Sequence, residues 1–213
     1  MEHQNIYPAH RAKQMEFILT QAEELMIEKG IEKVTVTDVI RKTHLMRSTF
    51  YRYFSSKEEL LWQIMQKHIC QFMAGFENKM RQQCPKNTYS IISLFFEELY
   101  LQYQTNPSTF LFIRLYRTTY LENTHYSGYT NRSQLQSHYR SGGLIQLLLQ
   151  NYPDSSVSFS DSVYETGVML VYAPISFAAE LLQISDDLDA KYMVSSQNVF
   201  RTYLDSLLKS IRC

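Results

Sequence analysis

The residues with the most distinctive chemistry are polar side chains that share one side of a short helical stretch. They are Arg47, Ser48, Tyr51 and Arg52. Arginine and serine can hydrogen-bond to base edges, and tyrosine and arginine can also hold phosphates. Phe50 and Phe54 are four residues apart, so they would lie together on the inner side of the same helix. This stretch predicts a helix with a buried aromatic side and a DNA-contacting outer side.

A second short helix precedes this one and would position it. The hydroxyl of Thr35 can cap that helix, and Asp38, three residues later, can reach back to complete a capping box. Val39 and Ile40 then fall on one apolar face. Two short helices joined by a tight turn over residues 35–54 predict a helix-turn-helix.

The run from residue 30 to residue 60 resembles the amino-terminal signature of the TetR family of transcriptional regulators. It reads G-I-E-K-V-T-V-T-D-V-I and then S-T-F-Y-R-Y-F-S-S-K-E-E-L. The motif covers about residues 11–65, and beyond it only the helical layout and the length agree. The resemblance implies that Thr35 or Thr37 and Lys57 hold phosphates. The expected DNA-contacting set is Thr35, Thr37, Arg47, Ser48, Thr49, Tyr51, Arg52, Tyr53 and Lys57.

The turn departs from the family pattern at two positions. His44 stands where the family usually has glycine or another small residue, and Met46 stands where it usually has a serine cap. A histidine adopts positive φ only moderately well, and a methionine cannot cap a helix.

Periodicity along the whole chain predicts an all-α protein with two domains. Residues 1–57 form the expected three-helix DNA-binding domain, in which residues 1–10 are a loose arm and a first helix spans residues 11–29. Residues 58–213 form the expected helical effector-binding and dimerisation domain, begun by a connecting helix over about 57–80. Ser56 and Glu59 form a second predicted capping box at the start of that helix.

Further helices are expected in the carboxyl-terminal domain. One spans residues 88–104 and another follows the Asn106-Pro107 pair, which suits a cap and a first turn. A third spans about 131–151 and is weakened at Gly142-Gly143. The last two span about 160–184 and 189–211, and Pro174 should kink the first of them.

The family resemblance also implies a dimer built from the last two helices and an effector cavity among the middle ones. The expected dimer residues are Val171, Ile175, Ala178, Ala179, Leu182, Val199, Phe200, Tyr203, Leu204, Leu207 and Ile211. The expected ligand-binding residues are Phe95, Tyr103, Phe112, Arg114, Tyr116, Tyr139, Met169, Tyr172 and Phe177. The alternative for both sets is ordinary intramolecular core. A roomy aromatic cavity would suit an amphipathic or aromatic organic effector.

Charge is balanced overall, with 21 basic and 21 acidic residues, but it is uneven along the chain. The segment from residue 33 to residue 57 contains six basic residues and one acidic residue, which gives it a local net charge of +5. Phosphate contact depends on the electrostatic field of the protein surface that meets DNA, rather than on the net charge of the whole chain. Three cysteines lack metal or redox spacing, no signal peptide is evident, and no apolar run approaches the ~20 residues that span a bilayer. A cytoplasmic protein is expected.

Enzyme motifs are absent from the sequence, so no cofactor, metal site or catalytic residue is expected. The single E-x-x-H, from Glu122 to His125, is not the paired set of a di-iron bundle. His68 and Cys70 are two apart on a helix and cannot share a ligand. The expected function is a dimeric repressor that binds operator DNA and is released by a small effector. Two alternatives are an architectural or cell-division DNA-binding protein of the same fold and a helical enzyme or carrier.

Overall fold

The structure is a computed structural model that describes residues 6–116, 156–158 and 163–212. Its chain divides into two compact units, Met1–Lys67 and His68–Cys213. The sequence instead places the domain boundary after residue 57, at the start of the connecting helix. The helix expected at about 131–151, with Gly142 and Gly143, lies outside the described residues.

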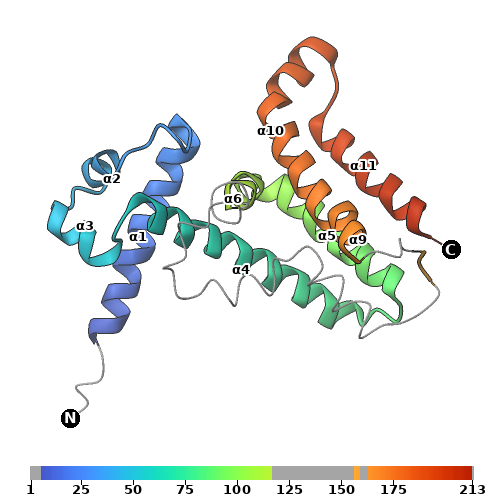
Figure 1. Ribbon diagram of the computed structural model, residues 1–213, viewed down its shortest axis with the longest axis horizontal. Helices are drawn as coiled ribbons and strands as arrows, with labels where there is room; N and C mark the ends of the chain where they lie inside the picture. Colours follow the sequence, from blue (N-terminus) through green and yellow to red (C-terminus); the bar gives the residue numbers. More distant parts are fainter. Residues whose placement is uncertain (1–5, 117–155, 159–162, 213) are drawn as a thin grey trace. The chain divides into compact units, whose positions relative to one another are not determined.

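The amino-terminal unit contains α1 (Ile6–Lys29), α2 (Val36–Thr43), α3 (Arg47–Tyr53) and the first turns of α4 (Lys57–Gln83). Figure 1 shows α2 and α3 as two short helices next to α1. Fully buried side chains from every helix form its core, among them Ile18, Ala22, Phe50, Phe54, Leu60 and Ile64. The expected loose arm is wrong for residues 6–10, which are helical. A proline such as Pro8 is tolerated in a first turn, where its missing N–H would have no partner.

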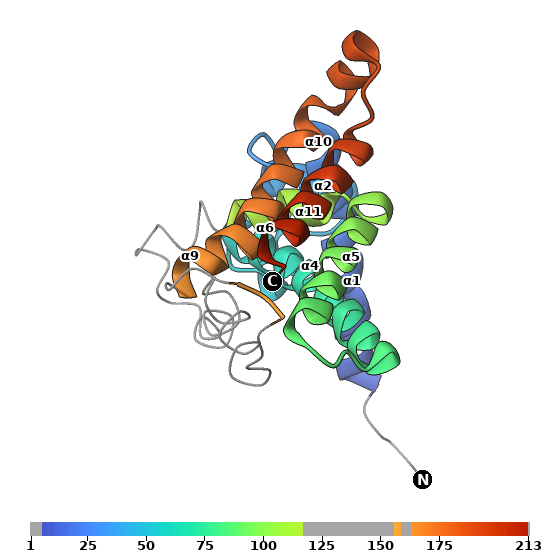
Figure 2. The same cartoon turned by 90° about the vertical axis from the view of Figure 1, so that its right-hand side faces the viewer.

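The carboxyl-terminal unit is also helical. After α4 it contains α5 (Thr88–Thr105), α6 (Ser108–Tyr116), α9 (Val163–Gly167), α10 (Ala173–Tyr192) and α11 (Ser196–Ile211). Helix α10 packs against α6 and α11, and α11 packs against α5; Figure 2 shows α10 and α11 side by side. Within the described residues the extended pairing is one isolated bridge between Val157 and Arg212. The fold class is all-α, as predicted.

Pro174 changes the helical hydrogen bonding, as its missing N–H requires. The turn before α10, Val168–Tyr172, is a π-helix labelled η3, in which the N–H of Ala173 donates to the carbonyl of Val168. One wide turn lets the chain pass the proline and continue as α10.

The predicted break between the last two helices is wrong. Helix α10 continues to Tyr192, and α11 starts only at Ser196. Met193 ends α10 with a left-handed φ of 52°, and the side chain of Ser195 caps α11 by accepting from the N–H of Asn198. A methionine gives no sequence signal for a left-handed residue, so the break could not be placed from residue type.

One helical stretch, Glu165–Tyr192, is long and apolar enough to cross a membrane by length and composition alone. Polar residues interrupt this stretch, so it contains no uninterrupted apolar run of the length that spans a bilayer. Core helices of helical domains pass the same test, and α10 buries Ala178, Ala179 and Leu181 in this unit. The stretch is therefore weak support for a membrane span.

Candidate nucleic-acid interface

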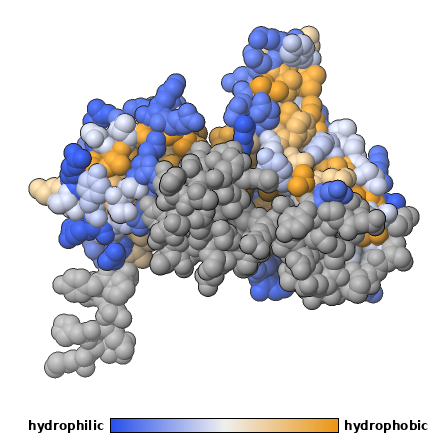
Figure 3. Space-filling view, in the orientation of Figure 1, coloured by the Kyte–Doolittle hydropathy of each residue, from blue (hydrophilic) through white to orange (hydrophobic). Residues whose placement is uncertain are grey.

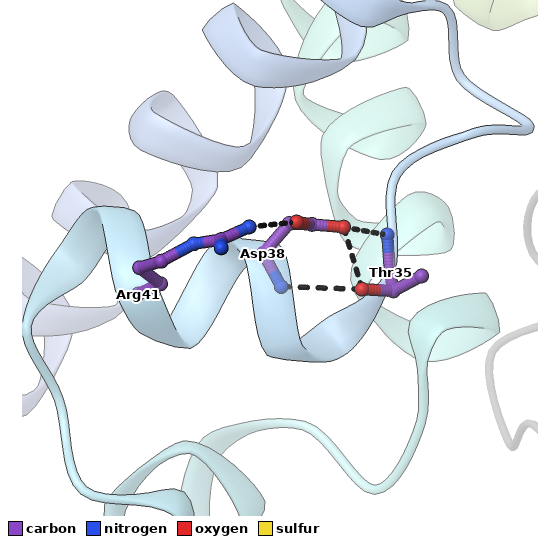
Figure 4. Close-up of polar contacts among 3 residues, drawn as sticks. All are labelled: Thr35, Asp38 and Arg41. Atoms are coloured by element: carbon purple, nitrogen blue, oxygen red, sulfur yellow. Dashed lines mark hydrogen bonds and ion pairs between the residues drawn. The ribbon is translucent and has the colours of Figure 1, made fainter.

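Helix α2 begins with the predicted capping box (Figure 4). The N–H of Asp38 donates to Thr35 Oγ1 at 3.2 Å, and the carboxylate of Asp38 accepts from the N–H of Thr35 at 3.0 Å. The hydroxyl of Thr35 also donates to that carboxylate at 2.6 Å, and Arg41 forms an ion pair with it. The side-chain and backbone hydrogen bonds from Thr35, helped by Arg41, lower the pKa of Asp38 to about 2.

The capping box has a consequence for the predicted phosphate contacts. Because the hydroxyl hydrogen and the N–H of Thr35 are both directed to Asp38, Thr35 cannot donate to a phosphate without breaking the cap. Thr37, the second residue of α2, is exposed, and no hydrogen bond to its hydroxyl is found among the described residues. Of the two expected threonines, Thr37 is the one whose hydroxyl the capping box leaves unused.

The turn between α2 and α3 uses the residue that departs from the family pattern. His44 has a left-handed φ of 54°, and its N–H is directed to the carbonyls of Arg41 and Ile40. The N–H of Leu45 donates to the carbonyl of Ile40 at 3.3 Å. These bonds close the end of α2 so that α3 can start at Arg47. Met46, at the cap position of α3, provides no side-chain hydrogen bond, as expected.

Helix α3 is oriented by its two phenylalanines. Phe50 and Phe54 have no exposed surface, and their ring centroids are 5.6 Å apart. With that side fixed in the core, the side chains of Arg47, Ser48, Tyr51 and Arg52 are exposed, and Thr49 is half-buried. The outer side predicted from the sequence is the solvent-facing side in the structure.

The two arginines of α3 contact neighbouring residues of the same helix. The guanidinium of Arg47 lies 5.7 Å from the centroid of the Tyr51 ring, and Arg52 donates to Thr49 Oγ1 at 3.3 Å. Within the part of the chain that the structure describes, neither arginine forms an ion pair with a carboxylate. Other cations of this unit do: Lys42 pairs with Glu24 at 3.0 Å.

Lys57 is held at the start of α4. Its Nζ donates to the carbonyl of Glu32 at 3.1 Å, so the ammonium keeps two further donors for a phosphate. Next to it, the N–H of Glu59 donates to Ser56 Oγ at 3.2 Å, while the Glu59 carboxylate accepts from the N–H of Ser55 at 2.6 Å. This cap fixes the backbone from which Lys57 extends.

Tyr53 has a neighbour that its sequence surroundings do not predict. The guanidinium of Arg11, in α1, lies 5.7 Å from the centroid of the Tyr53 ring. Arg11 is exposed and Tyr53 is half-buried, with its ring also against Phe54 at 6.5 Å. The two residues are far apart in the sequence, so only the fold reveals the contact.

The expected ligand-binding residues that the structure describes lie in several different surroundings. Phe95 is buried against Phe72 and Phe76, with centroids 5.5 Å and 5.6 Å away. Tyr103 is buried against Phe110 and Phe200, at 5.9 Å and 4.8 Å. Burial raises the pKa of the Tyr103 hydroxyl. These two aromatic residues belong to the packed core.

The other ligand candidates lie in different surroundings. Phe112 is buried and stacks on His68, with ring centroids 5.1 Å apart, and Nδ1 of His68 is 3.0 Å from Thr109 Oγ1. Arg114 does not point into the core: it is 39% exposed and pairs with Glu180 at 3.1 Å.

Five further candidates complete the ligand set. Met169 is exposed, whereas Tyr172 and Phe177 are half-buried. Tyr139 and the side chain of Tyr116 lie outside the described residues.

The expected dimer residues separate into two groups. Five are buried within the chain itself: Ala178, Ala179, Phe200, Leu204 and Ile211. Six are only half-buried and pack at the edge of the core: Val171, Ile175, Leu182, Val199, Tyr203 and Leu207. Figure 3 shows apolar surface over α10 and α11. The first group is held in the core of a single chain, so only the second offers surface to a partner.

Among the described residues, no group of three or more histidine, cysteine, aspartate or glutamate side chains could hold a metal ion.

Comparison with known proteins agrees with this geometry. Residues 18–64, which include α2 and α3, match the bacterial regulatory proteins of the tetR family. This match covers the helix-turn-helix segment and none of the carboxyl-terminal unit. The chain is 26% identical over 94 residues to the uncharacterized transcriptional regulator YvdT of Bacillus subtilis, a match covering 44% of this chain and 47% of YvdT. It is 28% identical over 92 residues to the regulator EthR of Mycolicibacterium smegmatis, covering 43% of this chain and 42% of EthR.

Both sequence matches thus span less than half of the relatives' length. The likeness in fold to solved structures extends further along the chain. The regulator FadR of Bacillus subtilis, solved in complex with stearoyl-CoA, superposes with a TM-score of 0.62 at 16% identity. That likeness covers 92% of this chain and 98% of FadR.

Proposed function

We propose that this protein is a sequence-specific DNA-binding transcription regulator, and that α3 reads the major groove. The observation that carries the proposal is the division of α3 into two sides. Phe50 and Phe54 are fully buried in the core on one side. On the other side Arg47 and Arg52 are exposed and have no carboxylate partner in the described part of the chain. An arginine in this state is free to bind a guanine edge or a phosphate.

We further propose that the protein acts as a homodimer in the cytoplasm and represses transcription until an effector releases it. The half-buried apolar residues of α10 and α11 support the dimer, because a second copy of the chain could cover them. A dimer would also bind DNA more tightly, since two reading heads would occupy two half-sites. Release would be a population shift, in which the effector binds better to the conformation whose heads do not fit the operator.

For the effector we propose an amphipathic organic molecule. The carboxyl-terminal unit is rich in aromatic residues, and a cavity among them would accept an apolar chain. FadR, of the same fold, was solved with stearoyl-CoA, which makes this acyl-CoA a reasonable first probe. If stearoyl-CoA leaves operator binding unchanged, long acyl-CoA effectors are rejected while the DNA-binding proposal stands.

The test of the central proposal is selection of DNA from a random pool by the purified protein. The wild type and the Arg47→Ala, Arg52→Ala double variant are compared with a control of equal charge loss, Arg81→Ala, Arg201→Ala. The control arginines lie in the carboxyl-terminal unit and are exposed. We expect the wild type and the control to enrich a two-fold symmetric site and the α3 variant to lose it. Equal enrichment by the α3 variant would overturn the proposal.

A further inference from the structure

Arg11 extends from α1 toward the ring of Tyr53, at the carboxyl end of α3. Its guanidinium carbon lies 5.7 Å from the ring centroid, within the range of a cation–π contact. Tyr53 is itself half-buried and rests against Phe54, which is fully buried. The ring is therefore a fixed platform, and the platform sets where the guanidinium lies.

The guanidinium of Arg11 keeps its hydrogen-bond donors. Contact with an aromatic face leaves the five N–H groups in the plane of the guanidinium available. Arg11 is exposed, and no carboxylate within the described ranges pairs with it. Elsewhere in this unit Lys67, by contrast, is neutralised by Glu23 at 3.2 Å. Arg47 and Arg52, the arginines that are expected to contact DNA, are likewise exposed and without a carboxylate partner in the described part of the chain.

We propose that Arg11 is a DNA-backbone contact positioned by Tyr53, and that Tyr53 serves as its platform rather than as a reader of the groove. The inference rests on the proposed function, since it supposes that α3 enters the groove. It adds a phosphate contact from α1 beside the helix that reads the bases. A guanidinium contact to phosphate orients the protein on the duplex and carries no base preference.

A purely structural contact would give different behaviour. A cation–π pair that only stabilises the unit would change its unfolding temperature and leave the salt dependence of DNA binding unaltered. A phosphate contact changes that dependence, because each neutralised phosphate releases counterions. The salt slope of DNA binding therefore separates the two roles.

The experiment measures binding of the full chain to its selected operator and to unrelated DNA across a range of salt concentrations. Arg11→Ala is compared with Lys13→Ala, an exposed cation two residues along the same helix and so on a different face. For Arg11→Ala we expect severalfold weaker binding to both DNAs and a salt slope smaller by about 0.9 per head. For Lys13→Ala we expect an unchanged slope.

Two substitutions of Tyr53 test the platform. Tyr53→Phe keeps the ring face and should keep the Arg11 contribution to the salt slope, whereas Tyr53→Leu removes the ring and should lose part of that contribution. In the Arg11→Ala background, Tyr53→Leu should then have little further effect. Additive losses from Arg11→Ala and Tyr53→Leu, or a changed base preference in Tyr53→Phe, would overturn the platform role.

The outcomes also separate this inference from the proposed function. If Arg11→Ala keeps the full salt slope while Arg47→Ala loses site preference, the protein is a DNA reader and the inference about Arg11 is wrong. If the wild type binds no DNA selectively, the proposed function itself fails. Circular dichroism of each variant shows whether a loss of binding comes from unfolding.

Discussion

Asp38 is the one acidic residue in the basic stretch from residue 33 to residue 57, and it would repel a phosphate. Its position resolves the conflict. The carboxylate accepts from both the N–H and the hydroxyl of Thr35 and pairs with Arg41, so its charge is used within the protein. A carboxylate at the third position of a helix is also favoured by the helix dipole. Asp38 thus stabilises the helix that supports α3.

This arrangement predicts an unusually acidic carboxyl group. The pKa of Asp38 is lowered from 3.8 to about 2 in the folded protein. Because the folded pKa lies below the unfolded one, its contribution to stability is present above pH 3.8 and is lost as the pH falls toward 2. In a carboxyl-detected NMR titration we expect a midpoint near 2 for Asp38. A midpoint near 3.8, the ordinary value, would show that the capping box does not form in solution.

At the residue scale, the sequence predicts those features that depend on near neighbours. The capping box of Thr35 and Asp38 and the buried pair Phe50 and Phe54 follow from spacings of three and four, and the structure contains both. The contact between Arg11 and Tyr53 joins residues of two helices, so no local spacing could reveal it. The Thr35 hydroxyl cannot serve both the cap and a phosphate, and this conflict follows from the capping role that the sequence predicts.

At the scale of elements, α4 and α5 approach closely around a buried carboxylate. Glu98 of α5 has 1% of its surface exposed and lies 3.6 Å from the ammonium of Lys79, on α4. Gln102 donates to it at 2.9 Å. A Cβ at Gly75 would lie 2.3 Å from a carboxylate oxygen of Glu98, so this glycine makes room for the charged group.

We therefore expect Gly75→Ala to destabilise the protein although alanine favours a helix. The gain in helix propensity is about 1 kcal/mol, and forcing a group into a packed interior costs about 1–3 kcal/mol. Denaturant unfolding should show a net loss of up to about 2 kcal/mol. The clash predicts non-additivity: in the background of Glu98→Ala, the same Gly75→Ala change should be neutral or stabilising. A loss of equal size in both backgrounds would show that Glu98 does not restrict this position.

The start of α5 is well predicted because a side-chain cap marks it in the sequence, whereas the boundaries of α10 are decided by backbone geometry. Asn87 caps α5 by accepting from the N–H of Ser90, and the predicted start at Thr88 is correct. The end of α10 depends on a left-handed Met193, and its start depends on a π-turn before Pro174. Neither conformation is specified by the residue types alone, so these boundaries required the structure.

At the scale of the whole molecule, the proposed dimer must use surface that a single chain leaves open. The buried members of the expected interface, such as Phe200, already stabilise one chain. Leu182 of α10 and Val199 of α11 are only half-buried at the edge of the core, and a second copy could cover them. A dimer interface needs about 800 Å² from each partner, which calls for apolar surface from both helices.

Leu182→Glu tests the dimer directly. If a second copy covers Leu182, the charge would be buried without a partner on both chains, and the dimer should dissociate. Light scattering after gel filtration should then report a monomer, while circular dichroism retains its helical signal, because in one chain this position is only half-buried. Gln183→Glu adds a carboxylate at the neighbouring exposed position and should remain dimeric.

The same two variants connect the dimer to DNA binding. A monomer can occupy one half-site only, so Leu182→Glu should lose the preference for a two-fold symmetric operator over a single half-site. Its intrinsic affinity for one half-site should be that of Gln183→Glu, since α3 is unchanged. If Leu182→Glu stays dimeric, Leu182 of α10 is not part of the interface. Val199→Glu would then test whether α11 alone provides it.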